Sequence, residues 1–492
     1  MVLLQYDDHS CENRAIEIVM SDSSDTIAHP DIERMAADAF GLMQSLPRAI
    51  AENDKHAEQA VEAGFKTKPA DFVVDERLAF DIERAIDDSG NGTKDLAAVS
   101  EIADTTDKDA EHLLLRIRKT RVNTLDIQRM LAQWIGCRRS DVGYSGLKDV
   151  QAVTSQWFSM PYRQTYLAVA EISTGDGSLS QIARACQSAL EKKLSQTTAK
   201  ATTEVNRASA TIDVIDAARY SRKLRPGSHV DNRFTIVLRE CKLSAGEPLL
   251  DNLNSLSTAH QDDAQGHSAV QMLFEERLQA VKTHGFPNYF GLQRFGRRGS
   301  NLATFLDLIR DTKKVAGGGG RRGRLSPRQQ MALSAARGFI FNSYCASRVG
   351  SDSWLTAETG EPVMLGSGNG FFVNDGLDTT VTERILAGDL SPSGPLVGRA
   401  DGRDRSSVER VEQECDDLID GLIARFDDVR RLSCLSQQFF ERIGLRHQRR
   451  ALRAMPRNLD WHWIDRTTLQ IEFELPPGVY ATALLQQLGL RV

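Results

Sequence analysis

Segments with the pattern of β-strands lie near both ends of the chain, and helical patterns fill most of the stretch between them. Strands are predicted at 71–80, 112–118, 153–160, 165–173, 233–241 and 468–475. The final strand is followed by a predicted helix at 481–488. This order predicts that the final strand and helix return to the sheet of the first domain, so that the helical region is an insertion.

Helices are predicted where apolar residues recur at helical spacing between start and stop signals. Their ranges are 124–135, 180–194, 300–310, 326–349 and 405–430. Thr124 is the predicted N-cap of the first helix, and Gly136 supplies its stop. Ser326 is the predicted N-cap of the fourth, with Pro327 at the first helical position.

Two loops are predicted within the helical region, at 317–323 and 391–395. The first begins with four glycines, but it lacks the Gly-Lys-Ser/Thr ending of a phosphate-binding loop and follows a helix rather than a strand. We therefore interpret it as a flexible linker.

The composition is that of a soluble globular protein with two to four domains, because 41% of the residues are hydrophobic and 26% are charged. No segment approaches the roughly 18 uncharged apolar residues of a membrane-spanning helix. The first residues do not resemble a signal peptide, so we expect a cytoplasmic protein. The seven cysteines form no Cys-x-x-Cys pair and the ten histidines form no ligand cluster, so neither disulfides nor a metal site are predicted.

The net charge of −6 is unevenly distributed. Residues 1–62 hold 13 acidic and 4 basic side chains, a net of −9, which leaves +3 for the rest of the chain. Short basic runs occur at 116–121, 219–225, 294–298 and 446–457. Each run is either part of a surface that binds a polyanion or an ordinary solvated face, and charge alone favours the second interpretation.

A glycine-punctuated loop lies between the predicted helix at 124–135 and the strand at 153–160. It reads Gly143-Tyr-Ser-Gly-Leu-Lys-Asp149. Two glycines allow a sharp turn and a close approach to a ligand, and the strand that follows fixes the loop to a rigid scaffold. By residue type alone, Lys148 and Asp149 are either a catalytic pair or a surface ion pair on an ordinary turn.

The segment 143–158 resembles the signature of the TruD family of pseudouridine synthases, whose Gly-x-Lys-Asp-x-x-Ala-Val-Thr-x-Gln-Trp sequence contains a nucleophilic aspartate. Six further motifs occur in the order that the family has them. They lie at 66–74, 222–234, 287–296, 392–398, 444–450 and 475–482. The resemblance runs from about residue 65 to the C-terminus, and seven ordered motifs make it highly specific.

Three positions depart from the family pattern. Ala70 stands where the family usually has Glu, and Asp231 replaces the Gly before Asn232. The backbone at Asp231 must therefore avoid conformations that only glycine adopts easily. Tyr480 replaces the usual Phe, which keeps the ring and adds a hydroxyl.

The resemblance implies an α+β fold, with a pseudouridine synthase catalytic domain built on a mixed, mainly antiparallel sheet and an inserted, mostly helical domain typical of TruD proteins. We expect the catalytic domain at 63–283 and 456–492 and the inserted domain at 284–455. Residues 1–62 are expected to be an acidic N-terminal extension outside the resemblance, whose order the sequence does not decide.

The implied reaction breaks the C1′–N1 glycosidic bond of a uridine, turns the uracil and joins C5 to C1′. It needs no redox or energy input, so no cofactor is expected. By resemblance Asp149 is the nucleophile, although attack on the sugar, addition to the ring and proton abstraction all remain open. Lys66, and after it Lys148, is the expected cationic partner that keeps Asp149 ionised, and both could instead contact phosphates.

The target base must leave its stack and enter a pocket. By resemblance Phe234 stacks on the uracil, Asn232 bonds it, and Tyr480 packs its ring near Asp149. Phe72 either lines the same pocket or belongs to the core.

The expected substrate is RNA, and by family resemblance a uridine in the D-arm of tRNA, with mRNA, snRNA and rRNA as alternatives. Arg222, Lys223 and Arg225, together with Arg449 and Arg450, are expected to contact the RNA backbone. We expect a monomer that needs no metal or membrane. The rival interpretations are a non-catalytic RNA-binding or RNA-folding factor on the same scaffold, and an N-glycosidase that uses Asp149.

Overall fold

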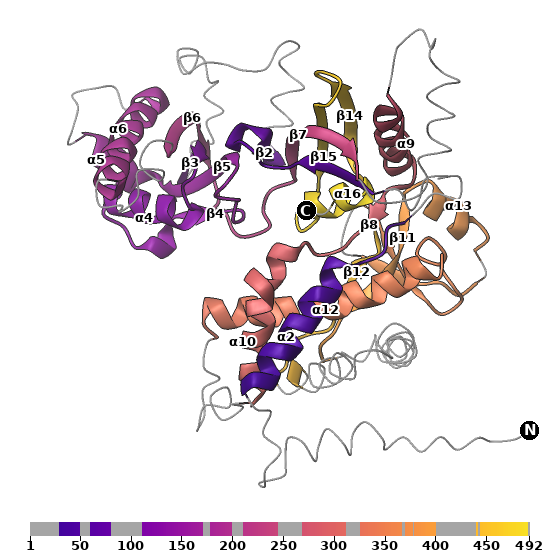
Figure 1. Ribbon diagram of the computed structural model, residues 1–492. Coiled ribbons are helices and arrows are strands. Elements are labelled where there is room, and N and C mark those ends of the chain that lie inside the picture. The colour runs from indigo at the N-terminus through magenta and orange to yellow at the C-terminus, as the bar shows by residue number, and fades with distance from the viewer. Residues whose placement is uncertain are drawn as a thin grey trace, which may run out of the picture. The chain divides into compact units, whose positions relative to one another are not determined.

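The computed structural model describes residues 29–49, 60–79, 111–170, 178–198, 210–244, 268–310, 325–366, 370–376, 378–399, 439–440 and 443–490. Contacts divide the chain into two compact units. Unit 1 takes residues 1–60, 272–455 and 479–492, and unit 2 takes residues 61–271 and 456–478. Figure 1 follows this path by colour, with the yellow C-terminal hairpin returning to unit 2.

Unit 2 is built on one large sheet. Its strands are β1 (Val61–Gly64), β2 (Phe72–Arg77), β3 (His112–Thr120), β4 (Gly143–Tyr144), β5 (Val153–Pro161), β6 (Thr211–Tyr220), β7 (Asp231–Leu243), β14 (Arg457–Trp463) and β15 (Leu469–Leu475). The main path runs β14-β15-β7-β2-β5-β3-β6, with β1 on β7 and β4 on β5. Among the strands of this sheet that the structure describes, β2 and β5 pair in parallel and the other pairs are antiparallel. The sheet is therefore mixed and mainly antiparallel, and the predicted return of the final strand is confirmed by its pairing with β7.

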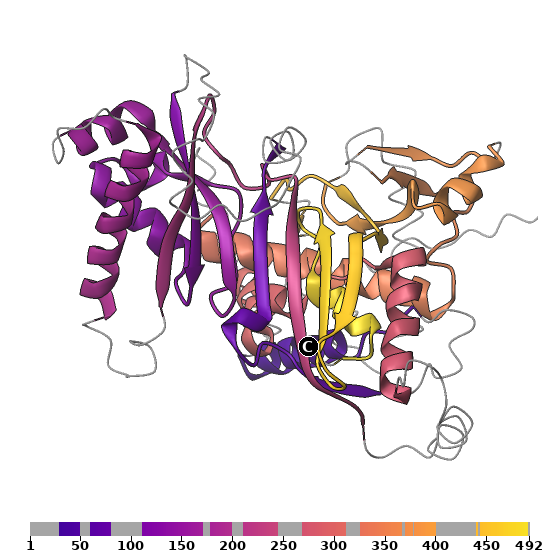
Figure 2. The ribbon, with the colours of Figure 1, turned by 90° about the horizontal axis from the view of Figure 1, so that it is seen from above.

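Three helices cover one face of this sheet at its β3–β6 end: α4 (Thr124–Ile135), α5 (Tyr162–Ala170) and α6 (Leu179–Thr198). Figure 2 shows these purple helices beside the strands. Leu113, Leu115 and Ile117 alternate along β3 and pack with them in a buried core. Short 3-10 turns at Pro69–Asp71 and Arg139–Asp141 precede β2 and β4.

The strand predicted at 165–173 is wrong, because most of that segment is helix α5. Thr165 and Val169 are buried and stand four residues apart, which is the spacing of one helical face. The Thr165 hydroxyl donates to the Pro161 carbonyl, 2.8 Å away, as a threonine inside a helix can. The aromatic and β-branched residues favoured a strand, but packing against α6 decides the structure.

The predicted N-cap of α4 is also wrong by one residue. Asn123 caps the helix by accepting from the Leu125 amide at 3.0 Å. Thr124 instead donates to Gln156 Oε1 at 2.7 Å and accepts from the Lys148 amide at 3.2 Å. Its hydroxyl thus ties the helix to the loop that carries Asp149. The predicted stop is confirmed, since Gly136 adopts a left-handed conformation with φ of 67°.

Unit 1 is mostly helical. Its helices are α2 (His29–Gln44), α9 (Ala269–His284, in this unit from residue 272), α10 (Ser300–Arg310), α12 (Pro327–Gly350), α13 (Thr380–Leu386) and α16 (Ala481–Gln487), with 3-10 turns at Leu292–Phe295 (η4) and Arg297–Gly299 (η5). Helix α12 is buried along most of its length. The predicted cap is confirmed, because Ser326 and Gln329 form a capping box around Pro327.

The predicted loop at 391–395 is wrong, because these residues belong to a strand. A four-stranded sheet in the order β10-β9-β11-β12 contains β9 (Pro362–Leu365), β10 (Phe371–Val373), β11 (Leu390–Leu396) and β12 (Gln448–Ala451), and a second pairing joins β8 (Phe286–Pro287) to β13 (Arg453–Ala454). Strand β11 pairs with β9 over residues 390–392 and with β12 over 393–396. Strand β11 thus changes its partner between Pro392 and Ser393, and the Pro392 carbonyl also accepts from the Leu452 amide at 2.9 Å.

The N-terminal extension is not wholly separate from the fold. Ile32, Met35, Ala36, Ala39 and Met43 of α2 are buried in unit 1. These apolar positions recur at helical spacing, and α2 packs on α10. The predicted helix at 405–430 and the glycine-rich loop at 317–323 lie outside the described residues.

The final helix is grouped differently from our expectation. Contacts assign α16 to unit 1, whereas the sequence placed 456–492 together in the catalytic domain. Leu484 and Leu485 are fully buried, and α16 packs on β8. The Arg277 guanidinium of α9 donates to the Leu488 carbonyl at 2.8 Å, which ties the end of α16 to the same unit.

Candidate active site

The glycine loop at 143–149 is held against the basic segment at 222–228. A Cβ at Gly143 would collide with the Leu224 carbonyl oxygen and the Ser159 hydroxyl, so only glycine fits this close approach. The Gly227 amide donates to the Ser145 carbonyl at 2.7 Å. Two motifs that lie about 80 residues apart in the sequence are thus neighbours in unit 2.

Asp149 stands at the end of this loop with its carboxylate held at both oxygens. Oδ2 pairs with the Lys66 ammonium, and Oδ1 accepts from the Gln151 amide at 2.8 Å. Burial opposes ionisation of Asp149, but the hydrogen bond and charge of Lys66 outweigh it, so the pKa of Asp149 lies below its usual value. Because 34% of its side chain is exposed, this ionised carboxylate remains accessible to a substrate.

Lys66 is fixed by its own surroundings. It adopts a left-handed conformation with φ of 57°, which is uncommon for a residue other than glycine. Its ammonium lies 4.2 Å from the ring centroid of Phe72 and 5.1 Å from that of Phe65. Two aromatic rings therefore help to direct this cation toward Asp149.

Lys119 is a buried residue that contacts the backbone of the loop at Asp149. It was not singled out from the sequence. Its side chain is fully buried, and Nζ donates to the Asp149 carbonyl at 3.2 Å. Burial lowers the pKa of Lys119 to about 8. We grouped it with a basic run at 116–121, but strand alternation puts it on the same face as the core residues Leu115 and Ile117, and that pattern could have identified it.

Lys148 does not pair with Asp149. Its ammonium lies 2.7 Å from Oε2 of the fully buried Glu76 and donates to Asn232 Oδ1 at 2.9 Å. The amide nitrogen of Asn232 lies 3.1 Å from His229 Nε2. Burial, reinforced by the charge of Lys148, lowers the pKa of His229 to about 4, so the imidazole is neutral at physiological pH. Sequence reasoning missed Glu76 and His229, although both lie beside motif residues.

The aromatic residues form a buried cluster on the same sheet. Phe234 stacks on Phe473 with ring centroids 5.2 Å apart, and it lies 6.1 Å from Phe72. Strand register explains the grouping, since Phe234 faces Val74 on β2 and Phe473 on β15, while Asn232 faces Glu76. Phe72 and Phe234 are 6% and 7% exposed, so both contribute to the core whatever else they do.

Asp231 occupies an ordinary strand conformation, in keeping with the expectation that its backbone avoids glycine-only geometry. Its carboxylate is fully buried and accepts from Arg77 at 2.7 and 2.9 Å and from Arg457 at 2.8 Å. Arg77 also pairs with Glu474 at 2.5 Å. The acidic side chain at this position is therefore compensated within the sheet.

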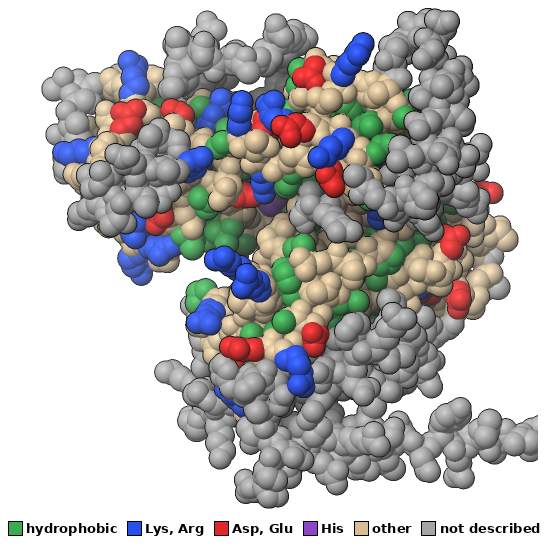
Figure 3. Space-filling model, viewed as in Figure 1, with side chains coloured by type: hydrophobic (Ala, Val, Ile, Leu, Met, Phe, Trp, Pro, Cys, Tyr) green, Lys and Arg blue, Asp and Glu red, His purple; other side chains and the backbone are tan. Residues whose placement is uncertain are grey.

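The residues expected to contact RNA fall into two groups. Arg222, Lys223 and Arg225 are exposed in unit 2, and Lys223 also donates to the Ser140 carbonyl. Arg449 is buried in unit 1 and donates to the Ser393 carbonyl at 3.3 Å, and its contact with the RNA backbone stays a prediction. Figure 3 shows basic and acidic side chains interspersed on the visible surface rather than one basic stripe.

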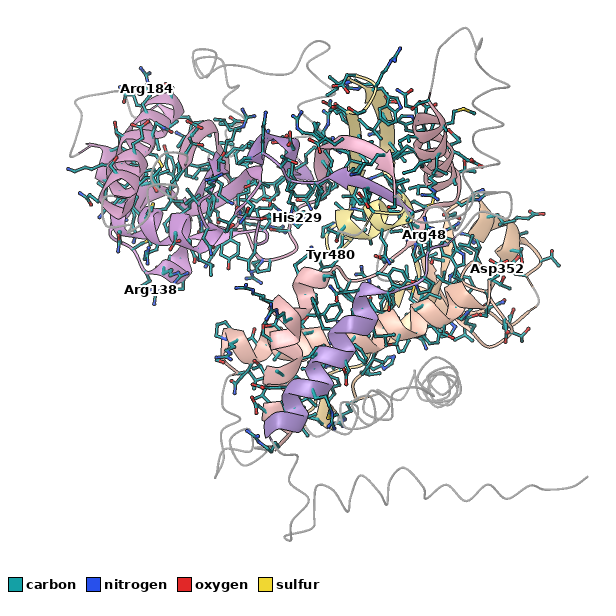
Figure 4. All side chains as sticks on the ribbon, in the orientation of Figure 1. Arg48, Arg138, Arg184, His229, Asp352 and Tyr480 are labelled. Atoms are coloured by element: carbon teal, nitrogen blue, oxygen red, sulfur yellow. The ribbon has the colours of Figure 1, made fainter. Side chains whose placement is uncertain are left out.

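Arg450 and Tyr480 are both in unit 1. The Arg450 guanidinium lies 4.1 Å from the ring centroid of Phe290, and the Tyr480 ring meets Phe290 edge-on at 5.9 Å. Figure 4 labels Tyr480, which precedes α16, and His229, which precedes β7.

Among the described residues no group of three or more His, Cys, Asp or Glu side chains could hold a metal ion. In the same part of the chain, no helix combines the length and apolar character that crossing a bilayer requires.

Comparison with known proteins identifies the family. The model of the family described as tRNA pseudouridine synthase D (TruD) matches residues 56–197, 189–311 and 324–488. A tRNA pseudouridine synthase D from Xanthomonas euvesicatoria pv. vesicatoria is 32% identical over 90% of this chain and 94% of that protein. One from Psychrobacter arcticus is 30% identical over 87% and 90%. A solved TruD structure from Methanosarcina mazei has 15% identity and a TM-score of 0.44, over 87% of this chain and 93% of that one.

The family model matches most of the chain, and the matches to the relatives cover nearly the whole length of those proteins. These sequence matches together support the assignment. The chain belongs to the tRNA pseudouridine synthase D family and is an isomerase of the pseudouridine synthase class.

Proposed function

We propose that this protein converts a uridine in the D-arm of tRNA to pseudouridine, with Asp149 as the nucleophile. The observation that carries the proposal is the ionised, partly exposed carboxylate of Asp149, held by Lys66 at the end of a loop that packs against the segment 222–228. Relatives across the same length of chain are named for this reaction on tRNA. A tRNA substrate would place the enzyme in the cytoplasm.

The chemistry requires a negative group beside the glycosidic bond. The C1′–N1 bond breaks, the uracil turns, C5 bonds to C1′, and the proton lost from C5 is balanced by the one gained at N1. Asp149 would form and release a bond to the substrate, which divides one difficult step into two. Lys66 would keep Asp149 ionised before the reaction, and Lys119 would fix the loop through the Asp149 carbonyl.

The remaining residues would bind and orient the substrate. Asn232, oriented by Lys148 and His229, would bond the edge of the flipped uracil, and Phe234 with Phe72 would supply flat apolar surface for its ring. Tyr480 is a predicted member of the pocket. Arg222, Lys223 and Arg225 are exposed where they would contact phosphates without reading sequence.

The decisive experiment uses purified protein and unmodified tRNA transcripts. Carbodiimide labelling followed by primer extension should reveal one new pseudouridine with the wild type. Asp149→Asn should abolish it while RNA affinity stays within about tenfold, because the amide keeps the shape but not the nucleophile.

Three results would contradict the proposal. Binding without any modification would indicate an RNA-binding factor on the same scaffold, and RNA that aniline cleaves at the target would indicate an N-glycosidase. Substantial turnover by Asp149→Asn would show that another group is the nucleophile.

A further inference from the structure

Two arginines lie against one aromatic ring in unit 1, and a third stands on the adjacent helix α12. The guanidinium carbons of Arg294 and Arg450 lie 4.8 and 4.1 Å from the ring centroid of Phe290. Arg294 comes from η4 and Arg450 from β12. The third, Arg337 on α12, stands three residues from Ser334, which Arg294 contacts, and it donates to Gln448 Oε1 of β12, the strand that carries Arg450. Burial, reinforced by the charge of Arg294, lowers the pKa of Arg337 to about 10.

Helix α12 is partly exposed near these arginines. Between residues 332 and 349 every position is buried except Ser334 and Arg337, which stand three residues apart on one face. The Arg294 guanidinium donates to the Ser334 hydroxyl, so the partly exposed face of α12 meets η4 at this arginine. Gly338 lets the Phe290 ring pack beside them, since a Cβ there would lie 3.2 Å from that ring.

Among the described residues, the hydrogen-bond partners of Arg294 and Arg337 are neutral groups. Arg294 donates to Tyr480 Oη at 3.3 Å, Arg337 to the Leu396 carbonyl at 2.6 Å, and Arg450 to the Asn288 carbonyl at 3.1 Å. Within the part of the chain that the structure describes, neither Arg294 nor Arg337 reaches a carboxylate. Another arginine of α12 is paired with a carboxylate.

Arg348 lies about three turns further along α12 than Arg337. It is buried and pairs with Glu361. Unit 1 thus neutralises a buried arginine elsewhere on the same helix, whereas the described partners of the Arg294 and Arg337 side chains are hydroxyls, carbonyl oxygens, an amide oxygen and an aromatic ring. Like charges held together and partly desolvated repel one another, and a bound anion would relieve that repulsion. Planar guanidinium groups match the paired oxygens of a phosphate.

We propose that Arg294, Arg337 and Arg450 form an anion site that holds a backbone phosphate of the RNA substrate. The site lies wholly within unit 1, whereas Asp149 belongs to unit 2. It rests on the proposed function for the identity of the ligand, since an RNA substrate brings phosphates to the protein. Phe290 would serve as the platform that keeps two of the guanidinium groups apart and oriented.

Arg294 is the best position to test, because its contacts with Tyr480 and Ser334 join side chains only. Arg337 is less suitable, since it also holds backbone carbonyls of Leu396 and Arg446. The variants are Arg294→Gln, which removes the charge, and Arg294→Lys, which keeps it without the planar fork. Arg384→Gln is the matched control, because Arg384 lies in the same unit with Asp389 2.7 Å away.

The first measurement uses inorganic phosphate alone. Thermal melting of the full chain is followed as phosphate replaces chloride at constant ionic strength. An anion site predicts that phosphate raises the Tm of the wild type and of Arg384→Gln, that Arg294→Gln loses most of the rise, and that Arg294→Lys keeps part of it.

The second measurement uses labelled, unmodified tRNA transcripts. Arg294→Gln should bind about tenfold more weakly or worse, and the slope of log affinity against log salt should fall by about 0.7–0.9, as expected for one lost phosphate contact. Arg384→Gln should match the wild type in both respects. If phosphate acts on Arg294 but RNA affinity and slope do not change, the site takes free phosphate and not RNA, which overturns the proposal.

A purely structural role is distinguished by the same data. In that case Arg294→Gln would melt earlier, but its folded fraction would bind RNA with the wild-type slope, and the proposal would be wrong. Binding is measured apart from turnover. A wild type that binds through Arg294 without forming pseudouridine would refute the proposed function alone, whereas an active wild type with an unaffected Arg294→Gln would refute this site alone.

Discussion

Asp149 is subject to two opposing influences, and their balance makes its ionisation testable. Burial favours the neutral acid, whereas the Lys66 ammonium favours the carboxylate and prevails. A group whose pKa is depressed in the folded protein stays ionised as the pH falls, until the pH reaches that lowered value. The wild type should therefore keep its activity to an unusually low pH for an aspartate-dependent enzyme.

Lys66→Met should move the acidic limb of the pH–rate profile to higher pH. Without the ammonium, burial is the largest remaining influence on Asp149, so the pKa rises and the carboxylate is lost earlier as pH falls. Single-turnover rates on a tRNA transcript across pH would measure the shift. Lys68→Met, on the same loop but exposed, should leave the limb in place. An unmoved limb in Lys66→Met would mean that this pair does not control the reaction.

Phe234 and Phe473 provide a matched pair, because they stack on each other and only Phe234 is proposed to meet the uracil. Both Phe234→Leu and Phe473→Leu keep most of the apolar volume and should lower the melting temperature to a similar degree. Phe234→Leu should slow single turnover strongly, since it lacks a flat face for stacking, and Phe473→Leu should not. Equal slowing in the two variants would assign Phe234 to the core alone.

Residue types identified part of this site and could not identify the rest. The sequence singled out Asp149, Lys66 and Asn232 through motifs, because the motif spacing is visible in the chain. Glu76 and Lys119 escaped notice because their importance comes from burial beside Lys148 and Asp149, respectively. Nothing in a single sequence states that a charged residue of a strand faces inward, unless its alternation with apolar neighbours is followed.

At the scale of elements, predictions from local sequence signals are confirmed where a few neighbouring residues determine the backbone conformation. The N-cap at Ser326 and the helix stop at Gly136 are confirmed, since each depends on hydrogen bonds or backbone angles within a few residues. Helix α5 and strand β11 were predicted wrongly because their structure depends on distant partners. Packing against α6 and pairing with two different strands override local preference.

Because helix α2 is packed in unit 1, we expect two N-terminal truncations, one before α2 and one that removes it, to differ in stability. Removing residues 1–28 keeps every contact of α2 described here and should leave melting temperature and turnover near those of the full chain. Removing residues 1–49 exposes the surface that Ile32, Met35 and Met43 cover, each worth about 1.5–3 kcal/mol when fully buried. It also removes the bonds from Ala49 to Gln487 and from Gln486 to Leu46. Thermal melting would compare the two, and equal stability would show that α2 does not contribute to the core.

At the scale of the whole molecule, the sequence predicted that the chain leaves one sheet and returns to it. The order of strand and helix patterns contains that information, because β15 repeats the strand pattern far from β7, its partner. The grouping of α16 with unit 1 was not predictable in this way. An apolar helix face shows that it will be buried, but not against which unit.

Each unit contains a buried apolar cluster of its own, which predicts two unfolding transitions that can be shifted independently. Four of the five tryptophans, at 134, 157, 461 and 463, lie in unit 2, so fluorescence reports mainly on that unit. Leu115→Ala, in the core of unit 2, should cost about 2–5 kcal/mol there and lower the fluorescence transition.

Phe305 lies in unit 1 beside Phe439 and Phe440, so Phe305→Ala should leave the fluorescence transition in place. It should lower the midpoint of a second transition, which circular dichroism detects because helices dominate that signal. Calorimetry would compare both variants with the wild type. One transition that coincides in every probe and moves equally in both variants would show that the units unfold as a single cooperative body.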